Sequence, residues 1–198
     1  RGLGDVYKIQ GCIPTKTMIN ESEFAERLYQ DDYKKQAKLY SLALKRKDKL
    51  VTFLREKNVE KLAGNPNITL YDGTASFICP DTIKVTPPPE KNKKPFELTG
   101  KEVFINTGST PILPAIDGLK NNRYVYTSET LLHADILPHH LLIIGSGAIG
   151  LEFATMYAGF GSKVTILEAG KRFLPRADRE IAEYMPVSYT HLTLPTKR

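Results

Sequence analysis

A glycine-rich segment between two apolar runs constrains the fold of this chain most strongly. Residues 145–150 read Gly-Ser-Gly-Ala-Ile-Gly, a GxGxxG pattern that directly follows the apolar run 141–144. A helical pattern then continues to about Phe160, and a second apolar run, 163–167, ends at Glu168, eighteen residues beyond the last glycine. A strand, a tight glycine turn, a helix and a second strand in this order predict a β-α-β unit.

Each glycine of the predicted turn has a physical task if the turn binds a dinucleotide. Gly145 permits the tight turn, Gly147 lets the backbone approach a pyrophosphate, and Gly150 lets the helix and the strand pack closely. The first helical residues, Ala148 and Ile149, present free N–H groups and the positive end of the helix dipole to the phosphates. A glycine turn that binds nothing is the alternative.

Glu168 at the end of the second strand indicates which dinucleotide is bound. Its carboxylate can accept hydrogen bonds from a ribose 2′-hydroxyl and would repel a 2′-phosphate. The sequence therefore predicts NAD as the cofactor of this unit, in preference to NADP.

The second informative segment is residues 11–16, which read Gly-Cys-Ile-Pro-Thr-Lys. Pro14 suits the first turn of a helix, so Cys12 is expected near a helix N-terminus, where the dipole favours the redox-active thiolate. Taken alone, such a cysteine is more often an inert buried thiol. The chain has two cysteines in all, Cys12 and Cys79, so we expect catalytic cysteine chemistry or none. Cys79 is expected to be structural.

The rest of the pattern predicts a long helix, an antiparallel meander and a connector. Apolar residues at spacings of three and four predict a helix over 17–62, stopped by Gly64. Residues 109–119 read as a connector, and Ser128 is expected to cap a short helix through Leu132. Turn-bounded apolar runs predict strands at 68–71, 74–78, 82–86, 96–98 and 103–105.

Composition argues against several classes of function. No apolar run approaches the length of a membrane span and the N-terminus lacks the shape of a signal peptide, so we expect no membrane partner and a cytoplasmic location. The net charge of +6 comes largely from residues 34–61 and 91–94. Acidic residues are interleaved there, which favours a solvated helix face over nucleic-acid binding. His133, His139 and His140 have no ligand at metal spacing, so we expect no metal site.

The two ends of the chain look foreign to the rest. Residues 5–8 and 187–191 can be encoded by GATGTGTATAAG and GTCTCTTATACACAT, which become reverse complements of one another when extended by a few bases. Both ends resemble translated transposon-type sequencing adapters. We therefore expect residues 1–10 and about 187–198 to be adapter-derived tails. The alternative is a genuine, unusual pair of tails.

Several segments resemble class I pyridine nucleotide–disulfide oxidoreductases such as dihydrolipoamide dehydrogenase and mercuric reductase, and they occur in the family's order. GCIPTK resembles the redox-active segment, VFINTGSTPILPAI the turn that lines FAD, IIGSGAIGLEFA the NAD turn, and KVTILEAGKRFLPRAD the strand with the ribose-binding acid. Two longer stretches, 53–77 and 161–182, resemble the bacterial reactive-chlorine-resistance branch. Its members are described as hypothiocyanous acid or copper reductases.

The resemblance implies an α/β fold in two parts. A partial FAD-binding domain over 11–115, made of a helix and an antiparallel β-meander, would be joined to a second part over 116–186. That part holds a linker and the N-terminal half of a Rossmann NAD-binding domain. Cys12 would be the flavin-side redox cysteine, while Lys16 would lie near the flavin ring and pair with Glu152.

Further roles follow from the same resemblance. Thr107, Gly108 and Ser109 would contact FAD, and Ala75 is a weaker candidate near the adenosine end of FAD. Tyr7 stands where the family's Cys-x4-Cys pattern has its first cysteine. The redox partner of Cys12 is thus expected either to be lost with the native sequence ahead of residue 11 or to be absent altogether.

The implied function is that of an NADH-dependent, FAD-containing disulfide oxidoreductase. Hydride would pass from NADH to FAD and then to a cysteine pair, which reduces a small-molecule or small-thiol oxidant. The full-length enzyme is expected to be a homodimer, and this chain to be an inactive part of it. One alternative is a single-cysteine flavin NADH peroxidase that cycles through a sulfenic acid. Another is a non-catalytic module that binds a nucleotide or nucleic acid.

Overall fold

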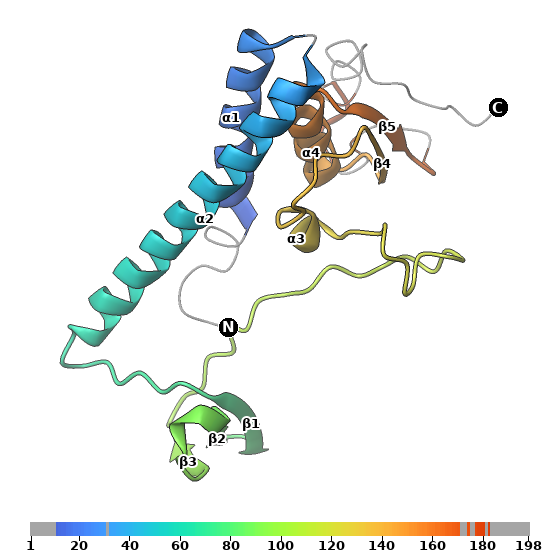
Figure 1. Cartoon of the computed structure of the whole chain (residues 1–198). Helices are drawn as coiled ribbons and strands as arrows, with labels where there is room; N and C mark the ends of the chain where they lie inside the picture. The colour runs from blue at the N-terminus through green and yellow to red at the C-terminus, as the bar shows by residue number, and fades with distance from the viewer. Residues whose placement is uncertain (1–10, 31, 171–173, 175–176, 181, 183–198) are drawn as a thin grey trace.

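The computed structural model describes residues 11–30, 32–170, 174, 177–180 and 182, and the tails expected at 1–10 and 187–198 lie outside these. The described chain is a mixed α/β structure. Its helices and strands, in chain order, are α1 (Ile13–Leu28), α2 (Tyr33–Ala63), β1 (Thr74–Cys79), β2 (Thr82–Thr86), the 3-10 turn η2 (Pro89–Lys91), β3 (Phe96–Thr99), α3 (Ser128–Leu131), β4 (His140–Ile144), α4 (Ala148–Gly159) and β5 (Lys163–Leu167). Figure 1 shows α1, α2 and α4 packed together, with the three-stranded sheet at the far end of α2.

Two helices occupy the region where the sequence pattern predicts one. α1 begins after Cys12 with a proline in its first turn, and it ends at Tyr29, whose backbone leaves the helical region at φ −142° and ψ 52°. Asp32 then caps α2, because its side chain accepts a hydrogen bond from the Lys35 N–H at 3.1 Å. The continuous helix predicted over 17–62 is therefore wrong. The break lets both helices fold back and pack against each other.

The antiparallel sheet has the order β1-β2-β3, with Ala75 opposite Val85 and Ile83 opposite Leu98. The strands predicted at 68–71 and 103–105 are wrong, since neither range is part of this sheet. A strand needs a neighbour to hydrogen-bond with, and apolar alternation alone cannot supply one. The described residues offer none there, and the side chains of Phe104 and Ile105 are largely exposed to solvent.

The short helix α3 begins one residue earlier than predicted. Thr127, not Ser128, is the capping residue: its hydroxyl accepts from the Thr130 N–H at 3.2 Å, and the Thr130 hydroxyl accepts from the Thr127 N–H at 2.8 Å. This reciprocal pair is a capping box in which threonine replaces the usual glutamate or glutamine. The prediction of Ser128 as the cap is therefore wrong, although the helix itself is present.

The predicted β-α-β unit is present. β4 and β5 pair in parallel, from His140 opposite Lys163 to Ile144 opposite Leu167, and α4 connects them. The main core lies between this unit and the helices α1 and α2. Its fully buried apolar side chains are Met18, Ala25, Tyr40, Ala43, Ala154, Met156, Tyr157, Phe160 and Ile166. None of the helices in the described ranges is long and apolar enough to cross a membrane.

Candidate functional site

The turn between β4 and α4 has a different geometry at each of its three glycines. Gly145 has φ +104°, a conformation that side chains disfavour, and its N–H donates to the Leu167 carbonyl at 2.7 Å. A Cβ added to Gly150 would lie 2.4 Å from the Gly145 carbonyl oxygen, whereas one added to Gly147 would meet nothing within 4 Å. The backbone is thus tightly packed at Gly150 and open at Gly147.

This open backbone fits the pyrophosphate of a dinucleotide. Gly147 is the N-cap of α4, so the free N–H groups of Ala148 and Ile149 stand at the positive end of the helix dipole. A cleft of about 470 Å³ lies beside the turn, and Gly145, Gly147, Ile149 and Gly150 all line it. Its other walls are mostly apolar and come from residues 111–114, 124–128 and 141–144.

Glu168 faces the glycine turn from the end of β5. One carboxylate oxygen accepts both the backbone N–H and the hydroxyl of Ser146, at 2.8 and 2.6 Å, and the other accepts the Gly170 N–H at 2.7 Å. These bonds, the Ser146 hydroxyl foremost, hold the pKa of the Glu168 carboxyl below its ordinary value. Ser146 was missed as a site residue, because its position in the GxGxxG pattern is one that the pattern leaves variable.

A second cleft, of about 380 Å³, brings Cys12 together with residues that lie far from it in the sequence. Cys12 is an exposed free thiol just ahead of α1, and Glu152 of α4 and Ser109 of the connector line the same cleft. The full lining is Gly11, Cys12, Thr15, Ser109, Thr110, Pro111, Ser128, Glu129, Leu132, Ile149, Glu152 and Phe153. Thr15, Ser128 and Glu129 are lining residues that sequence reasoning missed, since no motif marks them.

An ion pair joins the cysteine helix to the helix of the glycine turn. The Lys16 Nζ lies 2.5 Å from the Glu152 Oε1, and the side chains are 67% and 36% exposed. The hydrogen bond that Lys16 donates to Glu152 raises the pKa of Lys16, and the attraction between the two charges is the second cause. The pairing expected for these two residues is therefore present, while their role in catalysis stays a prediction.

The expected FAD contacts divide into two groups. Gly108 adopts φ +75° and turns the chain, and the next residue, Ser109, lines the cleft of Cys12. Thr107 and Gly108 are exposed and are not part of that lining. Ala75 lies in β1, which Figure 1 places away from α4 and the start of α1. The structure therefore brings Ser109 into the same cleft as Cys12, whereas Ala75 lies in a different part of the fold.

The sequence matches a model of a known protein family. Residues 2–191 match the model of the pyridine nucleotide-disulphide oxidoreductases. The chain belongs to this family. Its members use FAD and NAD(P)H.

Individual relatives support the same assignment. The probable pyridine nucleotide-disulfide oxidoreductase RclA of Escherichia coli is 45% identical over 173 residues, which are 87% of this chain and 36% of RclA. A mercuric reductase of Lysinibacillus sphaericus is 33% identical over 179 residues, 87% of this chain and 31% of the reductase. The structure of the HOCl-induced flavoprotein disulfide reductase RclA from Escherichia coli in complex with Cu(II) has a TM-score of 0.81 at 39% identity, covering 99% of this chain and 42% of RclA. This chain thus spans roughly a third to two fifths of the length of these relatives.

Proposed function

We propose that a full-length protein carrying this sequence is an NADH-dependent, FAD-containing disulfide oxidoreductase that reduces a small oxidant through a cysteine pair including Cys12. The observation that carries the proposal is the shared cleft of Cys12, Ser109 and Glu152, which lies next to the glycine turn. When bound, FAD would supply the ring that mediates between a two-electron hydride donor and a thiol.

The residues around Cys12 suit thiol chemistry. Cys12 is the N-cap of α1, and its exposed side chain can be reached by an oxidant from solution. In the reduced pair, one thiolate attacks the oxidant and forms a mixed disulfide or an equivalent adduct. The second thiol then displaces the reduced product, and the pair closes to a disulfide.

Lys16 and Glu152 have a supporting role in this proposal. Lys16 follows Cys12 by four residues, about one helical turn, and the ion pair fixes its ammonium against α4. A positive charge at this place would favour the thiolate of Cys12 and any negative charge that develops on a nearby flavin ring.

A visible spectrum of the full-length protein tests the proposal directly. We expect a yellow protein with a flavin absorption band, and a long-wavelength shoulder from a thiolate–flavin interaction after NADH is added. A colourless protein that binds nucleic acid in a salt-sensitive way would instead support the non-catalytic alternative. In that case the proposed function would have to be given up.

Replacing Glu168 by glutamine should change the choice of nicotinamide cofactor. The charged carboxylate repels a 2′-phosphate, so the Glu168→Gln variant should raise kcat/KM for NADPH relative to NADH by about tenfold or more. Because the hydrogen bonds to Glu168 keep its pKa low, this carboxylate should stay ionised between about pH 6 and 8, so any change of preference in that range should come from titration of the 2′-phosphate. Steady-state kinetics with both cofactors measure the ratio.

The exposed Glu97 of β3 provides the control for this substitution, since Glu97→Gln makes the same chemical change far from the turn. An unchanged cofactor ratio in Glu168→Gln would contradict the role given to this carboxylate.

A further inference from the structure

Three donor side chains on one face of α2 bind the segment that leads into the β-α-β unit. Tyr33, Tyr40 and Lys47 are seven residues apart, which places them on the same side of the helix at every second turn. We call these three residues the donor ladder. They donate, in that order, to the backbone oxygens of Leu137, Ala134 and Leu132, at 2.5, 2.7 and 2.6 Å. The helix and the segment therefore run in opposite directions, joined at three points.

The segment 132–137 needs these donors. α3 has only four residues. The Thr130 and Leu131 oxygens at its end accept from the N–H groups of His133 and Ala134, but no helix follows to supply N–H groups to the carbonyl oxygens of 132–137. The side chains of Leu132, Ala134 and Leu137 are buried in the core and draw this backbone away from water. A buried carbonyl without a donor is costly, and the donor ladder removes that cost at three positions.

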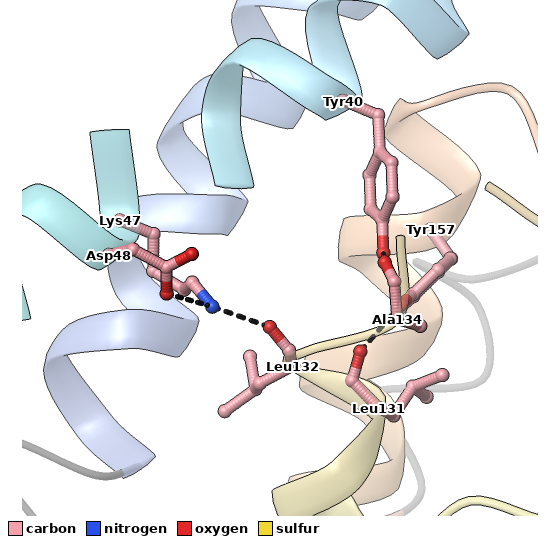
Figure 2. A network of polar contacts seen from close by, with 7 residues as sticks. All are labelled: Tyr40, Lys47, Asp48, Leu131, Leu132, Ala134 and Tyr157. Carbon is pink, nitrogen blue, oxygen red and sulfur yellow. Dashed lines mark hydrogen bonds and ion pairs between the residues drawn. The ribbon is translucent and has the colours of Figure 1, made fainter. Parts of the chain in front are cut away.

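The hydroxyl groups of two tyrosines at the centre of the network make more hydrogen-bond contacts than they have hydrogens to donate. Tyr40 and Tyr157 are fully buried, and their hydroxyl groups are 3.0 Å apart. Figure 2 shows them meeting from α2 and α4. Tyr40 also lies 2.7 Å from the Ala134 oxygen and Tyr157 lies 3.2 Å from the Leu131 oxygen, which makes three contacts for two hydrogens.

The distances assign the hydroxyl hydrogen of Tyr40 and leave two acceptors for that of Tyr157. The hydrogen of Tyr40 belongs to its shortest contact, the Ala134 oxygen, so Tyr157 donates either to Tyr40 or to the Leu131 oxygen. Leu131 also accepts the Ala134 N–H at 3.2 Å. Burial raises the pKa of both phenols, so both keep their hydrogens. Loss of the Tyr40 hydroxyl thus leaves a buried carbonyl without a donor, whereas loss of the Tyr157 hydroxyl does not.

Lys47 adds a charged donor to the ladder. Its side chain is 1% exposed, yet its ammonium group has two acceptors, the Leu132 oxygen at 2.6 Å and the Asp48 Oδ1 at 2.8 Å. The carboxylate of Asp48 is largely in solvent. Figure 2 shows the Nζ lying between these two oxygens. A buried ammonium is expensive to desolvate, and an aliphatic side chain would pack at lower cost. An aliphatic side chain at this position could not, however, donate the hydrogen bond that Lys47 gives to the Leu132 oxygen.

Leu132 connects the donor ladder to the cleft of Cys12. Its oxygen accepts from Lys47, and the same residue lines the cleft of Cys12, as do Ser128 and Glu129 of α3. On the other side, the Tyr40 ring packs against the rings of Tyr157 and Phe160, with centroids 5.8 and 5.2 Å away. Both of these rings belong to the C-terminal end of α4, the helix that carries Glu152. The ladder is therefore attached to both walls of the cleft.

We propose that Tyr33, Tyr40 and Lys47 are positioning residues, which hold segment 132–137 against α2 and thereby fix α4 and Glu152 relative to Cys12. The inference rests on the proposed function for its effect on catalysis. Its structural part, the fixed segment, is independent of that function.

The test compares two single-atom deletions in the full-length flavoprotein. Tyr40→Phe and Tyr157→Phe each remove one buried hydroxyl and keep the aromatic core, so both variants should fold. Tyr40→Phe should speed amide hydrogen exchange in segment 132–137 about tenfold and slow flavin reduction by NADH in a single turnover about tenfold, with unchanged affinity for NADH. Tyr157→Phe should change either quantity by less than about threefold. Lys47→Met should behave like Tyr40→Phe.

Several results would overturn the inference. If Tyr40→Phe had wild-type rates of amide exchange and flavin reduction, the donor ladder would not hold segment 132–137 in place. If Tyr40→Phe and Tyr157→Phe had equal effects, the assignment of the Tyr40 hydrogen to the Ala134 oxygen would be refuted. Faster exchange with wild-type flavin reduction would leave the ladder a structural device and refute its positioning role. If the wild-type protein contained no flavin, the proposed function would fail, and the exchange rates would still decide whether the ladder holds the segment.

Discussion

Replacing Cys12 by serine should abolish turnover with a disulfide or other thiol-reactive oxidant, lowering kcat by at least about a thousandfold. A serine hydroxyl stays protonated at neutral pH and forms no disulfide, so neither the attack on the oxidant nor the closure of the pair can occur. The position of Cys12 at the start of α1 is compatible with serine, which is itself a favourable N-cap residue. The fold of Cys12→Ser should therefore be intact.

The spectrum and the kinetics of Cys12→Ser together separate redox loss from misfolding. We expect a normal flavin band and continued flavin reduction by NADH, but no long-wavelength shoulder and no oxidant turnover. Cys79→Ser is the matched control: Cys79 is equally exposed, but it lies in β1 and donates to Asp81 at 3.1 Å. A Cys12→Ser protein that retained a tenth of the wild-type turnover would contradict the assignment of Cys12.

The β-α-β unit could be predicted closely because its signals are local. The strands at 141–144 and 163–167 differ by at most one residue from β4 and β5, and the glycines bound the turn between them. Each of these signals acts within a few residues of the chain. The ion pair of Lys16 with Glu152 is different, since 136 residues separate the two. That pairing followed from the family resemblance and could not be derived from the spacing of charges.

Some failures of prediction share a physical cause, which is that the deciding partner lies elsewhere in the chain. Residues 103–105 have strand-like composition but no strand beside them in the described structure. The break between α1 and α2 has a local mark, the cap that Asp32 gives to α2, which sequence reasoning missed. The donor ladder has a visible spacing of seven in the sequence. Its acceptors are backbone carbonyls, which carry no sequence signal at all.

Two alanine substitutions in the glycine turn should separate the stability of the fold from dinucleotide binding. Gly150→Ala should destabilise the protein by about 3 kcal/mol, because its Cβ would lie 2.4 Å from a backbone oxygen that cannot move aside cheaply. Gly147→Ala should cost less than about 1 kcal/mol, since its φ of −71° suits alanine and its Cβ would enter open space. Denaturant unfolding of the full-length protein measures both.

Gly150→Ala should lose more stability than Gly147→Ala, but Gly147→Ala should lose more affinity for NADH. The open space at Gly147 is where the backbone would approach the pyrophosphate, so Gly147→Ala should weaken NADH binding at least about tenfold while the protein remains stable. Titration of NADH into the folded variant, below its unfolding temperature, gives the affinity. If Gly147→Ala bound NADH as tightly as wild type, the empty space beside this glycine would not be the pyrophosphate site. If it also unfolded as readily as Gly150→Ala, the contrast between packed and open backbone in this turn would be wrong.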